Sequence, residues 1–356
     1  MAYLAQLPDV KTVICVNRVA TIEATVRQHK SFELRGIILD SASSSKLKIL
    51  ETDTSKPFLG LSADTYQYLV NTVTHIIHNA WPMSLTRAVR AYESQFKVMQ
   101  NLIRLAREAS AHRQASFQFG FQFISSIGTV SYYPLWSGKA LVPEEPMTAE
   151  SVLAVGYADA KLICERMLDK ALNFAQFRPI VVRIGQIAGS TINGYWNPIE
   201  HLAFLIKSSQ TLKVLPDLKG SLSWCPVNDV AATLGELLMS DQVAHPIYHI
   251  ENPPRQPWPE MIETLASALD IPQQNVVPFE TWLARVRKFP GSSNDNPAGQ
   301  LVEFFSKHFI RMSCGDLILD TANSREHSET LRARGTVDAK LVAKYISSWK
   351  QMGFLM

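Results

Sequence analysis

The sequence predicts an α/β fold: a Rossmann-like, doubly wound parallel sheet with a smaller, mainly helical C-terminal substrate lobe. Short apolar, β-rich runs alternate with helical patterns through the first half of the chain, which is typical of βαβ units with parallel strands. From residue 258 onward the pattern is mainly helical, so a second lobe is expected there. With 356 residues, 46% of them hydrophobic, the chain can bury a core in one large or two ordinary domains.

Each expected strand is a short apolar run that ends in polar or turn-forming residues. Strands of the sheet are expected at residues 11–16, 47–51, 73–81, in a run that ends at Ser126, and at 179–184. Helices are expected at residues 2–7, 20–32, 63–72, 85–110, 157–175 and near 199–209.

The predicted Rossmann-like domain, which is expected to bind a cofactor, spans residues 1–190. Two later runs, at 222–227 and 247–250, look like strands that return to this sheet, so residues of about 222–251 contribute to it. The substrate-binding lobe then comprises residues 191–221 and 252–356. Residues 290–297, rich in proline, glycine and asparagine, are expected to form a surface loop.

Composition excludes several classes of function. The net charge of +3 is mild and no basic run is present, which argues against nucleic-acid binding. The four cysteines form neither a C-x-x-C pair nor a cluster with zinc spacing, so we expect reduced thiols in a cytoplasmic protein and no metal site. No run is apolar for long enough to span a bilayer, and the N-terminus has no signal-like pattern, so no membrane association is expected.

A site for hydride transfer to a carbonyl group can be built around Tyr157, Lys161 and Ser126. A phenol is a poor proton donor at neutral pH, and an ammonium four residues further along a helix lies on the same face and favours the phenolate. A strand-end hydroxyl, from Ser126 or alternatively Ser125, can bind the carbonyl oxygen as charge develops on it. By itself the Tyr-x-x-x-Lys spacing is a weak signal, because an ordinary helix with a solvated lysine shows the same pattern.

Other strand ends offer residues for a dinucleotide. Arg18 follows the first strand, where arginine suits the 2′-phosphate of NADP; the alternative is an exposed strand-end arginine. Asp53 follows the second strand and can meet the adenine, although a turn-forming aspartate would look the same. Asn79 and Ala80 follow the third strand, and parallel sheets bind ligands at the carboxyl ends of their strands.

Several stretches together resemble the extended short-chain dehydrogenase/reductases. Within them, the chain resembles the terminal thioester reductase domains of fungal nonribosomal-peptide-synthetase-like and polyketide synthase enzymes. The resemblance covers essentially the whole chain, and its most specific stretches are residues 78–83 (HNAWPM), 123–127 (FISSI), 156–161 (GYADAK), 182–189 (VRIGQIAG), 194–198 (GYWNP) and 311–315 (RMSCG).

The resemblance implies NADPH-dependent release of a carrier-bound acyl thioester as an aldehyde or alcohol in secondary metabolism. Ser126 would then polarise the thioester carbonyl, Tyr157 would protonate the oxyanion, and Lys161 would hold the nicotinamide ribose and tune Tyr157. The hemithioacetal so formed loses the phosphopantetheine thiol. The implied partner is the phosphopantetheine-carrier-bound substrate or its carrier protein.

The resemblance also completes the set of expected cofactor contacts. They are Arg18, Asp53, Asn79, Ala80, Ser125, Tyr157, Lys161, Gly185 and Ile187. Two tryptophans of the lobe, Trp196 and Trp224, are candidates for lining an acyl channel, although large aromatics are more often core residues.

One departure from the family concerns the phosphate-binding loop. The family begins with a strand and a T-G-x-x-G-x-x-G loop whose backbone N–H groups approach the pyrophosphate. Here the first glycine is Gly36, and the opening residues correspond to the end of the helix that follows that loop. We therefore expect a sheet without its central strand and a site without its diphosphate cradle, either because the true start lies upstream or because the chain is a truncated remnant.

Two alternative functions stay open at this stage. One is an extended short-chain reductase or epimerase that acts on a free small molecule. The other is a non-catalytic remnant that binds a carrier protein without turnover. The missing loop favours the remnant, whereas the presence of Ser126, Tyr157 and Lys161 speaks against it.

Overall fold

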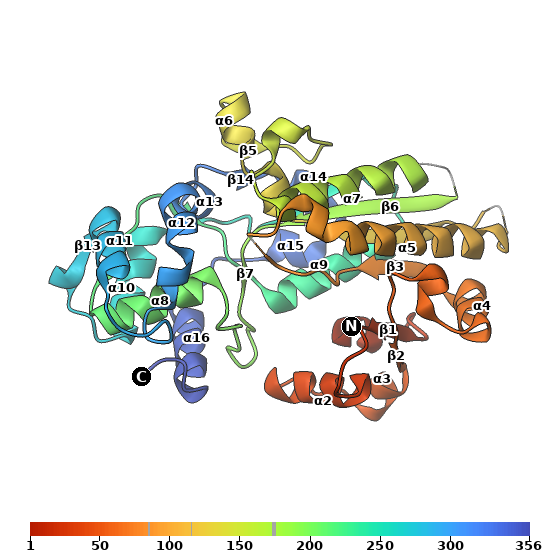
Figure 1. Ribbon diagram of the computed structural model, residues 1–356, viewed down its shortest axis with the longest axis horizontal. Coiled ribbons are helices and arrows are strands. Elements are labelled where there is room, and N and C mark those ends of the chain that lie inside the picture. The colour runs from red at the N-terminus through yellow and green to blue at the C-terminus, as the bar shows by residue number, and fades with distance from the viewer. Residues whose placement is uncertain (85, 115, 173–175) are drawn as a thin grey trace.

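Figure 1 shows the protein as a computed structural model, which describes residues 1–84, 86–114, 116–172 and 176–356. The expected helices at 85–110 and 157–175 each include positions outside these ranges, namely residue 85 and residues 173–175. Over the described residues, no helix is both long and apolar enough to cross a bilayer.

Strands and helices alternate through the first half of the chain. The strands are β1 (Val13–Asn17), β2 (Leu47–Glu51), β3 (His75–His78), β4 (Phe119–Ile124), β5 (Leu141–Val142), β6 (Phe177–Ile184), β7 (Ile187–Ala188), β8 (Leu215–Asp217), β9 (Ser221–Leu222), β10 (Cys225–Pro226), β11 (Ile247–Ile250), β12 (Gln256–Pro257), β13 (Val276–Pro278) and β14 (Ile318–Leu319). The helices are α1 (Ala2–Gln6), α2 (Ala24–Leu34), α3 (Ser41–Ser45), α4 (Ala63–Thr72), α5 (Glu93–Ala111), α6 (Tyr133–Ser137), α7 (Gly156–Leu172), α8 (His201–Leu212), α9 (Val227–Met239), α10 (Trp258–Ala268), α11 (Phe279–Lys288), α12 (Val302–Phe304), α13 (Ile310–Ser313), α14 (Ala322–His327), α15 (Glu329–Ala333) and α16 (Ala339–Gln351).

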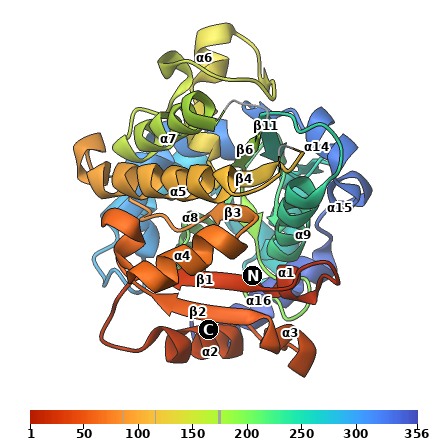
Figure 2. The same ribbon diagram turned by 90° about the vertical axis from the view of Figure 1, so that its right-hand side faces the viewer.

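The central sheet has four parallel strands in the order β11-β6-β4-β3. Every residue of β4 is buried, as expected of a strand covered by helices on both faces. Helices α5 and α7 cover one face, with α4 packed on α5, and helices α9, α14 and α15 lie on the other (Figure 2). The prediction of a doubly wound parallel sheet is therefore confirmed.

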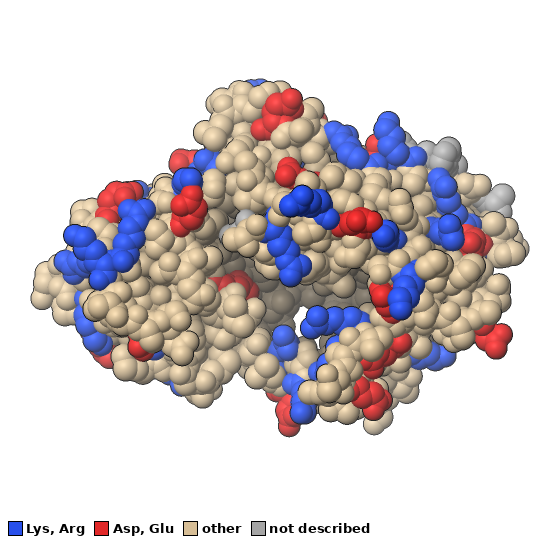
Figure 3. All heavy atoms as spheres, in the orientation of Figure 1, with Lys and Arg blue, Asp and Glu red and all other residues tan. Residues whose placement is uncertain are grey.

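Strands β1 and β2 form a second parallel sheet of their own. In the described residues β1 pairs only with β2, and β3 pairs only with β4, so one edge of each strand is free of ladder partners. The molecular surface is deeply hollowed between the part that contains β1 and β2 and the rest of the molecule (Figure 3). The strands that the sequence assigns to one sheet are therefore divided between two separate sheets.

The C-terminal lobe has its own apolar core between helices α8, α10, α11 and α16. Trp196 and Trp224 belong to this core, with 3% and 2% of their surface exposed and ring centroids 5.1 Å apart. The prediction that they line an acyl channel is wrong, because both rings are enclosed by other aromatic side chains.

Residues 222–227 do not form the single returning strand that their apolar pattern predicts. They contribute to two short strands, β9 and β10, which pair with β12 and β7 rather than with the central sheet. Trp224, between them, packs edge-to-face on Trp258 of the lobe and so interrupts the strand. The second run, β11, does join the central sheet beside β6. The domain boundaries at residues 190, 222 and 251 remain predictions.

Candidate active site

Ser126 lies two residues after the end of β4, at the carboxyl edge of the central sheet. Its side chain accepts a hydrogen bond of 3.1 Å from the backbone of Gly128 and so starts the short 3₁₀ turn Ile127–Val130. A Cβ atom on Gly128 would lie 3.3 Å from that of Ala158 and 3.4 Å from Ser126 Oγ. The glycine therefore lets this turn approach helix α7 closely.

Tyr157 occupies the first turn of α7 and meets Ser126 across Gly128. A Cβ atom on Gly128 would lie 3.4 Å from Ser126 Oγ and 4.0 Å from a ring carbon of Tyr157, so the two side chains border the same glycine. The helix start is seated by Gly156, where a Cβ would come within 2.4 Å of the Arg87 carbonyl oxygen and of the Val89 nitrogen. Close backbone packing at Gly156 thus brings the phenol to the end of β4.

Lys161 lies one helical turn after Tyr157, and 3% of its surface is exposed. Its ammonium nitrogen donates to the carbonyl oxygen of Ile124 over 2.6 Å. The same nitrogen lies 4.1 Å from the ring centroid of Trp81, 4.9 Å from that of Phe123 and 5.9 Å from that of Tyr157. The lysine is therefore a buried group held by one carbonyl and a wall of aromatic rings, not a solvated surface residue.

Burial controls the ionisation of both groups. It raises the pKa of Tyr157, with the nearby Ser126 hydroxyl acting in the opposite direction. It lowers the pKa of Lys161 to about 7, although Cys164 and Glu165 favour the charged form. The sequence predicted a lowered phenol pKa, whereas in this structure burial raises it.

Ser125 contacts a different part of helix α7 from Ser126. It is 5% exposed, and its hydroxyl donates to the carboxylate of Glu165, which also binds the guanidinium of Arg183. The structure thus separates the two serines that the sequence left as alternatives. Ser126 faces Tyr157, and the side chain of Ser125 is engaged in a buried ionic network.

The residues expected at the adenosine end of the cofactor lie on the small sheet. Arg18 follows β1 and is exposed, and its carbonyl oxygen accepts a hydrogen bond from the Arg27 guanidinium. Asp53 follows β2, is exposed, and accepts hydrogen bonds from the backbone and hydroxyl of Ser55, which lower its pKa. Both side chains are free to face solvent at the carboxyl end of their strands, but neither contacts Tyr157 or Lys161.

The remaining expected contacts lie at the ends of β3 and β6. Asn79 and Ala80 follow β3 and are exposed. Gly185 follows β6, where its nitrogen donates to Ile250, and Ile187 is part of β7; both are half-buried. The structure therefore brings Ser126, Tyr157 and Lys161 into one cluster and leaves the cofactor residues around it, along the carboxyl ends of the parallel strands.

Three residues of the cluster were missed by the sequence reasoning as site residues. Trp81 stacks on Tyr92 with ring centroids 5.9 Å apart and covers the Lys161 ammonium. Glu165 and Arg183 form the ion pair below Ser125. The signals were available: Glu165 continues the four-residue spacing of Tyr157 and Lys161, and Arg183 is a charge inside an apolar strand.

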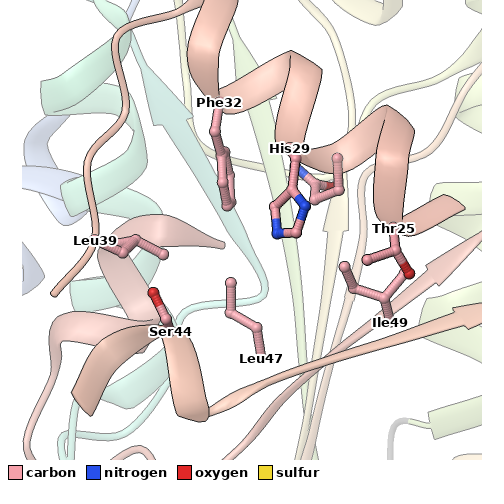
Figure 4. Close-up of a pocket in the computed structure, with 8 residues that line it drawn as sticks. Thr25, His29, Phe32, Leu39, Ser44, Leu47 and Ile49 are labelled. Atoms are coloured by element: carbon pink, nitrogen blue, oxygen red, sulfur yellow. The ribbon is translucent and has the colours of Figure 1, made fainter. Parts of the chain in front are cut away.

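A cavity of about 320 Å³ lies elsewhere, between α2, α3 and β2 (Figure 4). Its lining residues are Thr25, Gln28, His29, Phe32, Leu39, Ser44, Leu47 and Ile49. All of them belong to the first 49 residues, so this cavity is separate from the Ser126, Tyr157 and Lys161 cluster. Among the described residues, no group of three or more His, Cys, Asp or Glu side chains could hold a metal ion.

Comparison with known proteins identifies the family. The profile of an NAD-binding family described as "Male sterility protein" matches residues 2–234. The chain belongs to this family. The match includes every strand of the central sheet and of the β1-β2 sheet except β11, and it covers all the residues of the cluster.

Relatives of this family member include fungal polyketide synthases. The chain is 64% identical over its whole length to a citrinin polyketide synthase of Monascus ruber and 57% identical to the clavatol synthase claF of Penicillium crustosum. It spans about 14% of the length of each of these relatives.

Solved structures share the fold of this family member. The terminal R domain from the myxalamid PKS-NRPS biosynthetic pathway superimposes with a TM-score of 0.80 at 22% identity, covering 99% of this chain and 87% of that one. A thiolation-reductase di-domain from an archaeal nonribosomal peptide synthetase matches with a TM-score of 0.70 at 13% identity, covering 96% and 70% of the two chains. These likenesses establish the Rossmann-like architecture of reductase domains.

Proposed function

We propose that this chain is an NADPH-dependent reductase domain that converts a carrier-bound acyl thioester to an aldehyde or alcohol in polyketide biosynthesis. The observation that carries the proposal is the cluster at the end of β4: Ser126 and Tyr157 border the same glycine, Gly128, and the buried Lys161 lies one turn further along α7. The 64% identity to a citrinin polyketide synthase supports the biosynthetic context.

The residues of the cluster have distinct roles in this reaction. Ser126, at the strand end, would donate a hydrogen bond to the substrate carbonyl oxygen. Tyr157 would hold the proton that this oxygen takes up, and its raised pKa keeps that proton on the phenol until charge develops on the substrate. Lys161, half charged near neutrality, would favour transfer of that proton and bind the hydroxyls of the nicotinamide ribose.

The residues present fit the two ends of a dinucleotide. Tyr157 and Lys161 suit its nicotinamide ribose, and the exposed Arg18 suits the 2′-phosphate at its adenosine end. Asp53 is the proposed contact to the adenine, and Asn79, Ala80, Gly185 and Ile187 are proposed contacts between the two ends. Ser125 could contribute only through its backbone, because its hydroxyl is bound to Glu165. When bound, the cofactor supplies the hydride.

The experiment that tests the proposal supplies the chain with NADPH and an acyl pantetheine thioester. Loss of reduced nicotinamide absorbance together with aldehyde or alcohol release is the expected result, and the free acid is the matched control because it lacks the thiol leaving group. Turnover of a free ketone or nucleotide sugar in place of the thioester would support a small-molecule reductase or epimerase. Binding of a carrier protein without any turnover would support the non-catalytic alternative.

A further inference from the structure

The end of β4 meets helix α7 through three consecutive residues. The carbonyl oxygen of Ile124 accepts a hydrogen bond from Lys161. The hydroxyl of the next residue, Ser125, donates to Glu165. The side chain of Ser126 borders Gly128 together with the ring of Tyr157. Each of these three residues thus meets a different turn of the same helix face, since positions 157, 161 and 165 are four residues apart.

Glu165 is the most strongly held of these helix residues. It is 4% exposed, and its Oε1 accepts from Ser125 and, over 3.2 Å, from Nε of Arg183. Its Oε2 accepts from Nη2 of Arg183 over 2.8 Å. The carboxylate therefore fastens α7 to β4 and β6 at once through a bidentate pair, the geometry that is strongest for arginine and carboxylate.

Arg183 links the Glu165 carboxylate to residues outside the Ser126, Tyr157 and Lys161 cluster. It has no exposed surface, and its Nη1 donates to the carbonyl oxygen of Glu145 over 2.9 Å and lies 3.4 Å from Nε2 of His249 on β11. A buried ion pair of this kind is costly to desolvate, and apolar residues of similar volume often give equal or greater stability. Its presence directly below the candidate site therefore points to a positional role.

Glu165 is a carboxylate in an ion pair, whereas the other groups that face Lys161 are neutral near pH 7. His78 of β3 has its pKa lowered to about 3 by burial, and burial raises the pKa of Cys164 on α7 to about 12, so both are neutral near pH 7. Tyr157 is neutral there too, and the remaining walls are the rings of Trp81 and Phe123. Arg183 lies beyond the Glu165 carboxylate.

We propose that Glu165 is a positioning residue for the reaction: its carboxylate sets the height and rotation of α7 against β4 and places a negative charge one helical turn from Lys161. The catalytic part of this inference rests on the proposed reductase function. The electrostatic part concerns the folded chain alone, so it can be tested without turnover.

The test is a set of four chains: the parent, Glu165→Gln, Lys161→Met and the double variant. Urea unfolding between pH 6 and 9 measures the free energy of unfolding of each chain. The change caused by Lys161→Met is then obtained twice, once with Glu165 and once with Gln at position 165. With Glu165 present, the change in free energy of unfolding caused by Lys161→Met should begin to depend on pH near the Lys161 pKa of about 7. We call this pH the onset. In the Glu165→Gln background the onset should be lower by roughly half to one pH unit, because a nearby negative charge is lost.

A merely structural role for Glu165 predicts lower stability with an unmoved onset pH, and that outcome would overturn the proposal. Glu93→Gln, an exposed carboxylate paired with Lys97 on α5, is the matched control and should leave the onset unchanged. If Glu165→Gln does not fold, Glu165→Gln/Arg183→Met leaves no unpaired guanidinium and should show the same downward shift.

Turnover provides the second arm of the test. Glu165→Gln should lower kcat about tenfold to a hundredfold, since Tyr157 and Lys161 are displaced. The KM for the cofactor should change less, because the proposed cofactor contacts other than Tyr157 and Lys161 lie outside α7. An unchanged kcat would remove the catalytic part of the proposal. If the parent shows no turnover, the proposed function fails, and the unfolding arm still decides the electrostatic part.

Discussion

The ammonium nitrogen of Lys161 donates a 2.6 Å hydrogen bond to the carbonyl oxygen of Ile124, two residues before Ser126. This bond draws the lysine towards β4 and under the ring of Trp81, 4.1 Å away. Its distance from the Tyr157 ring centroid is 5.9 Å. The lysine thus positions the helix and strand relative to each other, in addition to any effect it has on the phenol.

Tyr157 is the proposed proton donor, and its hydroxyl is the group to remove. Tyr157→Phe should lower thioester turnover about a hundredfold or more, because general acid catalysis is lost, while cofactor binding stays close to that of the parent. Turnover and a cofactor titration measure the two effects separately. Tyr133→Phe, on α6 and outside the cluster, is the matched control, and equal turnover in both variants would exclude Tyr157 as the donor.

Lys161 makes the stability of the chain depend on pH in a defined direction. Its pKa is about 7 in the folded chain and near the ordinary 10.5 when unfolded, so the unfolded state binds more protons between these values. The penalty for burying the ammonium is fully present below pH 7 and is relieved as the pH rises. Lys161→Met removes this penalty, so its free energy of unfolding should exceed that of the parent by the largest amount below pH 7. This excess should fall by about 1.4 kcal/mol per pH unit above pH 7.

Urea unfolding of the parent and Lys161→Met at several pH values up to 9 checks this slope. Above pH 9 the buried thiols also contribute, because burial raises the pKa values of Cys164, Cys225 and Cys314 to about 12. Lys97→Met on the surface of α5 is the control and should differ from the parent by the same amount at every pH. If the change in free energy of unfolding caused by Lys97→Met depended on pH as strongly as that caused by Lys161→Met, the pH dependence would not arise from Lys161.

Arg18 is the proposed reader of the 2′-phosphate of NADPH. Arg18→Ala should reduce the preference for NADPH over NADH by about tenfold, as the loss of one charge-assisted contact implies. The ratio of the two dissociation constants is the measurement. Arg287→Ala, an exposed arginine of α11 in the lobe, should leave the ratio unchanged. A ratio unaltered by Arg18→Ala would place the 2′-phosphate elsewhere.

Gly156 seats the start of α7 against the backbone of residues 87–89. Gly156→Ala should lower the free energy of unfolding by about 1–3 kcal/mol, because its Cβ would lie 2.4 Å from backbone atoms of Arg87 and Val89. Gly335→Ala is the control, since open space surrounds a Cβ at that position. If Gly156→Ala were as stable as the control, the backbone of residues 87–89 would move at little cost to make room for the added Cβ.

The sequence by itself determined the position of several helices and strands and the shared helix face of two site residues. Periodicity located β2 and α4 at the residues where the structure has them, because these patterns are local. The four-residue spacing of Tyr157 and Lys161 placed both on one face of α7, since helix geometry requires it.

Only the tertiary structure decided what surrounds those residues. It separated Ser125 from Ser126, paired Glu165 with Arg183, enclosed Trp196 and Trp224 in the lobe core, and left β1 and β2 as a sheet of their own. It also set the direction of the pKa shifts of Tyr157 and Lys161, which depend on desolvation. Burial and partner choice arise from segments far apart in the chain, and no local pattern of residues contains them.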